Sequence, residues 1–239
     1  MKVFVSMLLC IFSSLSFAYT LMIEDDTFSD ESAENLITNK HYYFRRRLDV
    51  LNLNEDLPGW KKGERIAFLK FNLNSVPKGL LSENVHYASL RFFISGVIRP
   101  GYLGVYDVSQ AWEENSVNWT NQPEVGRPVA WALVNQDHEN RWLELNITNA
   151  VKRWINNPEA NFGVALRAPT PGSVPSAWVM IDTKEGNYDH DNIDSRFSNP
   201  GDINFAIERQ KALSPETIYN PPSGHPATIE VLFNTMISD

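Results

Sequence analysis

Apolar residues stand at every second position through most of this chain. One set is Ala67, Leu69, Phe71 and Leu73, and the same spacing recurs within segments 88–94, 143–147, 162–166, 179–181, 203–207 and 229–233. Because successive side chains of a strand point to opposite faces, each set places one apolar face inward. Many short strands separated by polar, Pro/Gly-rich turns predict an all-β fold, an antiparallel, jelly-roll-like β-sandwich, rather than alternating strands and helices.

One helical pattern interrupts this alternation, so we expect one or two short helices. Val151, Trp154 and Ile155 share a helix face that Thr148 can cap, and Asn157-Pro158 ends the pattern. Such a helix covers an open end or edge of the sandwich. The sequence has neither a solenoid repeat nor a second core-sized segment, which predicts a single domain over residues 19–239.

Residues 1–18 have the features of a signal peptide. Lys2 precedes an apolar stretch, and Ser16-Phe17-Ala18 places small residues where a signal peptidase requires them. We therefore expect a secreted protein (extracellular, cell-surface or periplasmic) that starts at Tyr19. Later apolar runs are shorter than the roughly 18–20 residues of a membrane span. Cys10 is removed with the leader, so a packed core must stabilise the mature chain without disulfides.

The charge is negative overall but uneven along the chain. The full sequence carries a net charge of −8, which argues against a nucleic-acid partner. Basic residues nevertheless gather early in the sequence, at Lys40, Arg45, Arg46, Arg47, Lys61, Lys62, Arg65 and Lys70. They are interpreted either as a local basic face or as ordinary solubilising charges on strands.

Segment 105–123 combines a strand pattern with two tryptophans and an Asn/Pro exit. The strand runs through Val108 to the helix-capping residue Ser109 and into a short turn that carries Trp112, with Trp119 further on. A buried tryptophan stabilises a core, and its truncation to alanine costs about 3–5 kcal/mol of stability. We interpret both tryptophans as core anchors rather than as a sugar-stacking surface.

The sequence of this segment resembles the W-x-E-x-S-V-x-W-x-N-x-P run of DNRLRE-type modules, which are grouped with carbohydrate-binding module family 96. Segments 64–79 and 142–154 are similar to two further runs of that family, with Asn72 and Asn146 where the family commonly has aspartate. Segments 161–166 and 227–233 stand at its late strands. The resemblance implies a β-sandwich that binds carbohydrate without catalysis, and its shared motifs mark strands and core rather than ligand residues.

The residues themselves carry no known catalytic signature. Metal-protease, nucleophile-elbow and phosphate-loop motifs are absent from the sequence, and the five histidines are scattered. Asp25-Asp26 and Glu113-Glu114 are adjacent acids, which point to opposite faces of a strand and form no ready acid/base pair. A carboxylate pair assembled across strands stays open. We expect a protein that is not an enzyme.

An acidic cluster offers the one metal hypothesis. Asp189, Asp191 and Asp194 place oxygen ligands two and three residues apart in a loop, where they could hold calcium. The cluster lacks the glycine and glutamate of an EF-hand, so solvated loop acids are the alternative interpretation. This cluster belongs to segment 186–226, the least regular part of the sequence.

Sugar binding requires exposed aromatic rings and planar polar groups. Trp60 is the leading candidate, because the turn Pro58-Gly59-Trp60-Lys61-Lys62-Gly63 would expose its ring beside two ammonium groups. With Tyr43, Arg45, Arg47, Lys61 and Lys62 it forms the predicted carbohydrate site, in which the basic groups would neutralise carboxylated or sulfated sugars. Further aromatic candidates outside the core pattern are Tyr42, Tyr102 and Trp131.

Three functions fit these observations. The first is a secreted carbohydrate-binding protein with a polysaccharide ligand, acidic and polyuronate-like. The second is a structural or adhesive protein-interaction module at the cell surface or in the extracellular matrix. The third is a polysaccharide lyase or hydrolase whose residues converge across strands.

Overall fold

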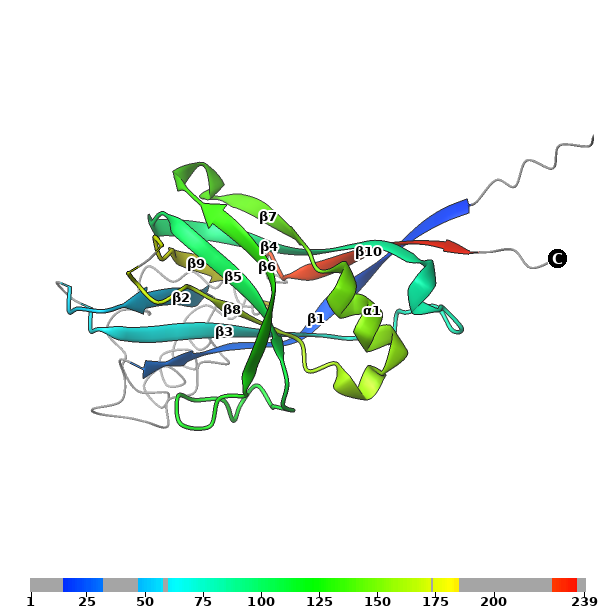
Figure 1. The fold of residues 1–239 in the computed structure, drawn as a ribbon, viewed down its shortest axis with the longest axis horizontal. Coiled ribbons are helices and arrows are strands. Elements are labelled where there is room, and N and C mark those ends of the chain that lie inside the picture. Colours follow the sequence, from blue (N-terminus) through cyan, green and yellow to red (C-terminus); the bar gives the residue numbers. More distant parts are fainter. Residues whose placement is uncertain (1–14, 32–46, 58–59, 173, 185–224, 236–239) are drawn as a thin grey trace, which may run out of the picture.

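The computed structural model describes residues 15–31, 47–57, 60–172, 174–184 and 225–235, which form an antiparallel β-structure with one short α-helix (Figure 1). The strands are β1 (Leu15–Asp30), β2 (Arg47–Leu53), β3 (Gly63–Phe71), β4 (Val85–Arg99), β5 (Gly101–Val108), β6 (Val125–Val134), β7 (Arg141–Asn146), β8 (Val164–Arg167), β9 (Trp178–Asp182) and β10 (Thr228–Thr235). The helix is α1 (Thr148–Asn156), and 3-10 turns cover Ser82–Asn84 (η2), Gln136–His138 (η3) and Pro158–Ala160 (η4).

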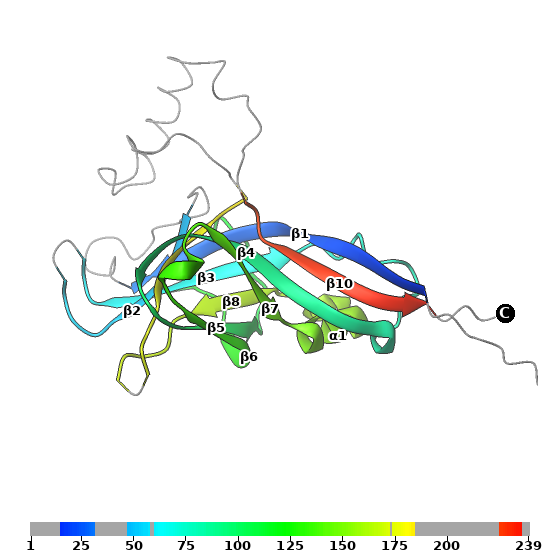
Figure 2. The same cartoon turned by 90° about the horizontal axis from the view of Figure 1, so that it is seen from above.

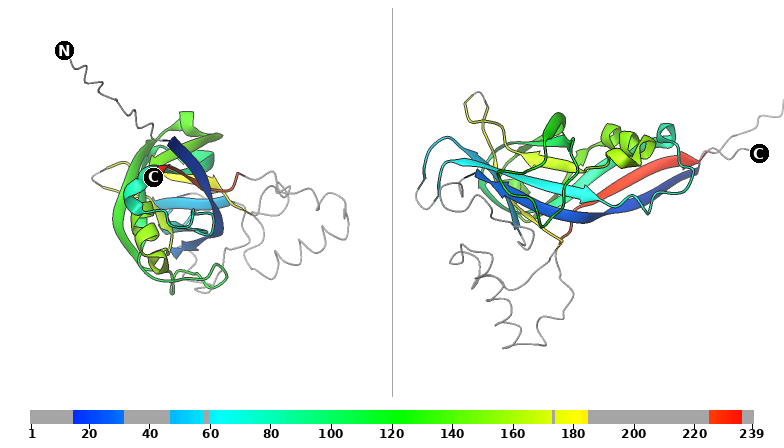
Figure 3. Two further views of the ribbon diagram at one scale, coloured as in Figure 1. Left: turned by 90° about the vertical axis from the view of Figure 1, so that its right-hand side faces the viewer. Right: turned by 90° about the horizontal axis from the view of Figure 1, so that it is seen from below.

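The strands form one sheet that closes on itself. Its order is β1-β10-β4-β9-β2-β3-β8-β5-β6, and β7 pairs with β4. β1 closes the sheet because its first half pairs with β10 and its second half with β3, with a register shift between Ile23 and Asp25. β1 and β10 run side by side in Figure 2, and the strands curve around a common interior when seen from the end (Figure 3).

The predicted all-β antiparallel class is confirmed, since every pairing between these strands is antiparallel. The sandwich is not established in its predicted form: β1 and β2 each pass between the two halves and join them into a barrel-like sheet. The jelly-roll arrangement therefore stays a prediction. Residues 15–18, which the sequence assigns to the leader, form the start of β1, where Ser16, Phe17 and Ala18 are exposed.

The interior is the core that the alternation predicts. Its fully buried members come from nearly every strand and include Leu48, Leu69, Phe92, Leu103, Val164, Ile181 and Ile229. Apolar side chains that leave water in this way supply most of the free energy of folding. Among the described residues, α1 is the only α-helix, and the described helices are too short to cross a membrane.

Helix α1 packs against β4 and η2 through Ala150, Val151 and Trp154, as its apolar face predicts, and it ends before Asn157-Pro158. The predicted cap is wrong. Thr148 is the first helical residue, and its hydroxyl donates to Asn146 Oδ1 (2.8 Å) and accepts from the Ala88 backbone N–H (2.9 Å). Asn146 Oδ1 also accepts the Thr148 backbone N–H at 3.0 Å, so the turn before the helix takes the role expected of a cap.

Segment 105–123 lies over the outer face of the sheet, where it buries a second cluster. Trp112 is 8% exposed, packs 6.1 Å from the Phe68 ring and donates its Nε1–H to the Phe162 carbonyl at 2.8 Å. Trp119 is partly buried against the same cluster. The core role predicted for Trp112 is confirmed, and it covers the part of the outer face formed by Ile66, Phe68 and Ala165.

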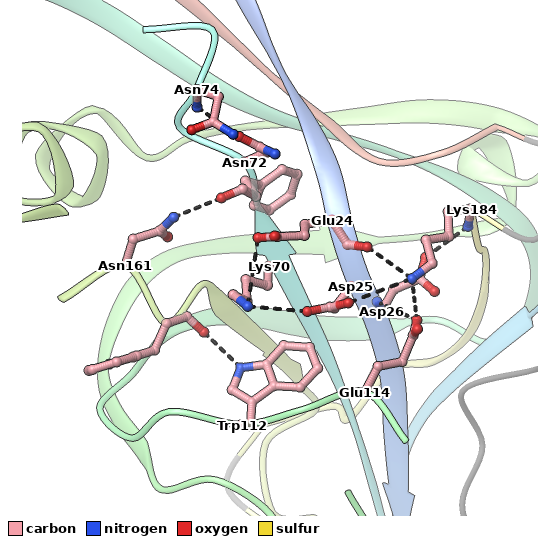
Figure 4. A network of polar contacts seen from close by, with 12 residues as sticks. Glu24, Asp25, Asp26, Lys70, Asn72, Asn74, Trp112, Glu114, Asn161 and Lys184 are labelled. Atoms are coloured by element: carbon pink, nitrogen blue, oxygen red, sulfur yellow. Dashed lines mark hydrogen bonds and ion pairs between the residues drawn. The ribbon is translucent and has the colours of Figure 1, made fainter. Parts of the chain in front are cut away.

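Lys184 ties this segment to the sheet through Glu114 (Figure 4). The Lys184 ammonium donates to Glu114 at 2.5 Å, and the Glu114 carboxylate accepts the Asp26 backbone N–H at 3.0 Å. On the neighbouring strand, the Lys70 ammonium donates to Asp25 at 3.2 Å. Asp25, Asp26 and Glu114 are thus engaged by lysines and backbone, which gives these three acids a structural role.

Candidate functional site

An aromatic surface lies on the outer face of β5 and β6. Tyr102 alternates with the buried Leu103 on β5, and Trp131 and Leu133 alternate on β6 with alanines that pack on the core. The exposed fractions are 36% for Tyr102, 45% for Trp131 and 57% for Leu133. Large apolar side chains this exposed on neighbouring strands form a patch of the kind that binds ligands.

Glycine makes this surface possible. Gly104 lies directly opposite Trp131 in the β5–β6 register, and the Trp131 and Tyr106 rings cover the space where a side chain would stand. A Cβ there would lie 2.6 Å from the Tyr106 ring and 2.9 Å from the Trp131 ring. The two rings meet edge to face, with centroids 5.4 Å apart. The glycine therefore lets both rings lie low on the sheet, as a platform.

A charged fork continues this surface across the sheet. Arg167 of β8 pairs with Gly104 on the other side of β5, and its Nε and a terminal nitrogen donate to the two Glu64 oxygens at 2.6 and 2.9 Å. The Asn52 amide donates to the same carboxylate at 3.1 Å. Since Glu64 is 7% exposed and Arg167 is half-buried, this pair is held in one orientation.

The fork and the aromatic surface affect each other electrostatically. The hydrogen bond with Glu64 raises the pKa of the Arg167 guanidinium. Burial raises the pKa of the Tyr106 hydroxyl, against a smaller opposite effect of Arg167. At neutral pH the site therefore presents a neutral tyrosine, an indole and a planar ion pair in one row.

Trp60, the leading candidate of the sequence, lies elsewhere and is partly covered. Its ring is 37% exposed, packs edge to face on Trp178 with centroids 4.5 Å apart, and lies 5.0 Å from the Arg65 guanidinium carbon. Backbone hydrogen bonds to Leu57 fix the turn at 2.9 Å in both directions. These contacts join Trp60 to the cluster of Leu51, Leu53 and Trp178, next to which it packs.

The two lysines of this turn, Lys61 and Lys62, contact Asp56 in different ways. The Lys61 ammonium donates to Asp56 at 2.8 Å, which raises the pKa of Lys61 and lowers the pKa of Asp56. Lys62 donates its backbone N–H to the same carboxylate, at 2.8 Å. Arg47, at the start of β2, is exposed and stands opposite Asp182 in the strand register. A glycan role for these residues stays a prediction.

The remaining predicted residues lie outside the described part of the chain. These are Tyr43 and Arg45 of the carbohydrate site and Asp189, Asp191 and Asp194 of the calcium hypothesis. Several basic residues of the early stretch have acidic partners. Arg65 pairs with Asp30 and Asp49, and Lys70 pairs with Asp25. Of the basic residues of this stretch that the structure describes, Lys61, Arg65 and Lys70 are neutralised by carboxylates, and a basic face over the whole stretch stays a prediction.

A protein-family model matches most of the chain. It is the model of carbohydrate-binding module family 96, and it matches residues 20–191. The chain belongs to carbohydrate-binding module family 96. This membership confirms the resemblance, and the matched range runs from β1 through β9. A search of curated proteins found no match for the chain.

The two family 96 positions that carry asparagine keep an acceptor role. Asn146 Oδ1 accepts from Thr148 before α1, and Asn72 Oδ1 accepts the Asn74 backbone N–H at 2.7 Å. An aspartate oxygen would accept the same hydrogen bonds. Asparagine in place of aspartate at positions 72 and 146 therefore keeps both turns and removes two negative charges.

Sequence reasoning named Tyr102 and Trp131 but missed the rest of this site. Glu64 and Arg167 are 103 residues apart, and the signal that could have found them was the placement of a charge at an outward position of each strand. In the sequence, Tyr106 belongs to the segment that contains Trp112. Its link to the site is the register that places β6 beside β5.

Proposed function

We propose that this family 96 protein is a non-catalytic carbohydrate-binding protein that holds a polysaccharide on the outer face of β5 and β6. The observation that carries the proposal is the pair of exposed rings, Tyr102 and Trp131, beside the fixed Arg167–Glu64 fork. Pyranose rings stack on aromatic faces, and planar polar groups beside them receive the hydroxyls. Family membership supports carbohydrate binding, while the position of the ligand rests on this geometry.

The test is glycan binding by matched variants. Wild-type protein is screened on a polysaccharide panel, and the dissociation constant for each bound glycan is measured for Trp131→Ala and Tyr102→Ala. Each variant should weaken binding by roughly 5- to 150-fold, as loss of a stacking ring of about 1–3 kcal/mol would. Trp142→Ala is the matched control, because Trp142 is 38% exposed on β7, which pairs with β4 rather than with β5 or β6 among the described strands.

Trp60→Ala distinguishes the two aromatic candidates. If the platform on β5 and β6 holds the ligand, Trp60→Ala lowers stability through lost contact with Trp178 and leaves glycan affinity unchanged. Loss of affinity in Trp60→Ala with normal affinity in Trp131→Ala would move the site to the turn and reject the platform.

We further propose that the ligand is acidic and that the protein is secreted after removal of residues 1–18. Polygalacturonate should bind more tightly than a neutral glucan of equal length, with an affinity that falls as salt rises. Amino-terminal sequencing of protein recovered from the medium or periplasm should begin at Tyr19. Recovery of the uncleaved chain inside the cell would reject the export proposal.

A second function is favoured by the sheet edge. Among the described strands β6 pairs only with β5, and Leu133 is 57% exposed there, so a protein partner could add a strand at this edge. A protein-interaction module would show no glycan binding in the screen above, and a Pro substitution at Ala132 would abolish partner capture.

A further inference from the structure

A basic cleft separates β6 from α1. It has a volume of about 520 Å³, and its polar lining consists of Arg127 from β6 and Asn149, Lys152, Arg153 and Asn156 from α1. The helix residues recur at spacings of three and four, so one face of α1 supplies the whole of that wall. Volumes of roughly 300–1,000 Å³ are those of small-molecule sites.

One carboxylate orients both arginines of the cleft. Asp107 of β5 accepts from a terminal nitrogen of Arg153 at 2.5 and 2.6 Å and from Arg127 Nε at 3.1 Å. A second Arg153 nitrogen donates to the Asn149 carbonyl at 3.0 Å, which holds the guanidinium against the helix. Asp107 is 18% exposed and Arg153 is 37% exposed, so their contact is partly shielded from water, whereas the Arg127 side chain is 65% exposed and reaches into solvent.

The cleft retains positive charge after this pairing. Arg127, Lys152 and Arg153 contribute three positive charges and Asp107 one negative charge, which leaves a net charge of +2. Among the described residues, the Lys152 ammonium and the terminal nitrogens of Arg127 have no hydrogen-bond or ion-pair partner. These donors stand on opposite walls, one on α1 and one on β6.

This charge contrasts with the rest of the molecule. The protein has a net charge of −8, and lysines such as Lys61, Lys70 and Lys184 are each paired with carboxylates. A cleft with unpaired donors on both walls attracts anions to one place on an acidic surface. Guanidinium and ammonium groups together suit a planar carboxylate or a tetrahedral ester oxygen group.

We propose that the cleft between β6 and α1 binds a sugar residue through an anionic substituent, a carboxylate or a sulfate ester. Arg127 and Lys152 hold the anionic oxygens from the two walls, and the amides of Asn149 and Asn156 receive hydroxyls at the rim. The inference rests on the proposed function, because it identifies a glycan substituent, and it assigns that substituent to a site other than the aromatic platform.

The first experiment uses monosaccharides, which test the cleft even if no polymer binds the platform. Galacturonate, glucose 6-sulfate and glucose are titrated at constant ionic strength, and backbone amide shifts are followed by NMR. The two anionic sugars should shift the amides of Arg127, Lys152 and Arg153, and glucose should not. The stronger of the two anionic sugars identifies the substituent. Equal responses to glucose, or no response at these amides, would overturn the inference.

The second experiment uses charge variants. Lys152→Gln and Arg127→Gln should each weaken the anionic monosaccharide about tenfold, the effect of one charge-assisted hydrogen bond. Lys78→Gln is the matched control, because it removes the same charge from an exposed position outside the cleft. Unchanged affinity in both cleft variants, with their folds verified by amide spectra, would overturn the inference.

Polymer binding separates this inference from the proposed function. Lys152→Gln should weaken polygalacturonate or dextran sulfate while leaving any neutral glycan unaffected, whereas Trp131→Ala should weaken every glycan. Loss of binding in Trp131→Ala alone rejects the cleft and retains the platform. Loss in Lys152→Gln alone rejects the platform and retains the cleft.

Discussion

The indole of Trp131 on β6 lies over Gly104, the residue directly opposite on β5. A methyl group at position 104 would stand 2.9 Å from this ring and 2.6 Å from the ring of Tyr106, so both rings must move in Gly104→Ala. We expect a stability loss of about 1–3 kcal/mol from overpacking and a red-shifted indole emission as Trp131 lifts toward water. Chemical denaturation and fluorescence measure the two effects.

Glycan affinity should also fall in Gly104→Ala, because the platform formed by the Trp131 and Tyr106 rings loses its shape. Gly126→Ala is the control on β6, since the nearest atoms to its methyl would be those of Asp107, the closest at 3.3 Å. Affinity is compared with a neutral glycan, because Asp107 orients the arginines of the basic cleft. Full stability and unchanged affinity in Gly104→Ala would show that the platform does not depend on the two rings lying on the glycine.

Trp112 should be the strongest single anchor of the segment over the outer face. Trp112→Phe keeps apolar contact with Phe68 but leaves the Phe162 carbonyl without its donor, which should cost about 1–3 kcal/mol. Trp112→Ala also opens a cavity and should cost about 3–5 kcal/mol. Urea denaturation should report both losses at a constant m-value, and Trp142→Phe, which keeps a ring beside Phe93 and His225, should change stability less than Trp112→Phe.

The order of these losses is the decisive result. A Trp112→Ala variant no less stable than Trp142→Ala would mean that segment 105–123 adds little to the fold, contrary to the burial of Trp112.

The alternating pattern predicted β3, β4, β7, β8, β9 and β10, because each buries one face in the core. It did not predict β6, in which Gly126, Pro128, Ala130 and Ala132 weaken the apolar signal. The platform was missed for the same reason, since its rings meet only through the β5–β6 register. The sequence also does not show whether an outward-facing residue is covered or exposed. Trp112 covers the part of the outer face formed by Ile66, Phe68 and Ala165, whereas Trp131 stays exposed.

The charge pattern had a similar limit. Arg65 and Lys70 read as free cations in the sequence, but strand pairing brings acids from β1 and β2 beside them. The basic cleft combines Arg127 with α1, and only the tertiary fold places these two segments together. The turn at Lys61 is the local exception, because Asp56 stands five residues before it.

The Arg167–Glu64 fork should stabilise the sheet and orient the site. Glu64→Gln removes the charge of a 7% exposed partner, and we expect a stability loss of about 1–3 kcal/mol, limited by the partial exposure of Arg167. Arg167→Gln should cost a similar amount, and the double variant should cost less than the sum of the two.

A double-mutant cycle from denaturant unfolding measures this coupling. Glycan affinity followed in the same variants reports whether the fork also contacts ligand. Additive losses would show that the two groups act independently, despite the 2.6 and 2.9 Å hydrogen bonds that join them.

Tyr19 should make the fold sensitive to alkaline pH. Its hydroxyl is buried beside Phe233 and has no hydrogen-bond partner among the described residues, and burial raises its pKa to about 12. The unfolded chain ionises near the ordinary value of about 10. Between these values the unfolded state has released the proton and the folded state still holds it, so stability is full below pH 10 and falls as the pH rises toward 12.

Tyr19→Phe removes the hydroxyl, so it should leave stability at pH 7 unchanged or raise it, and should reduce the loss between pH 10 and 12. Unfolding curves of both proteins at pH 7, 10 and 11.5 test this, with the exposed Tyr87→Phe as control. An equal alkaline loss in wild type and Tyr19→Phe would mean that the Tyr19 hydroxyl reaches water in the folded protein.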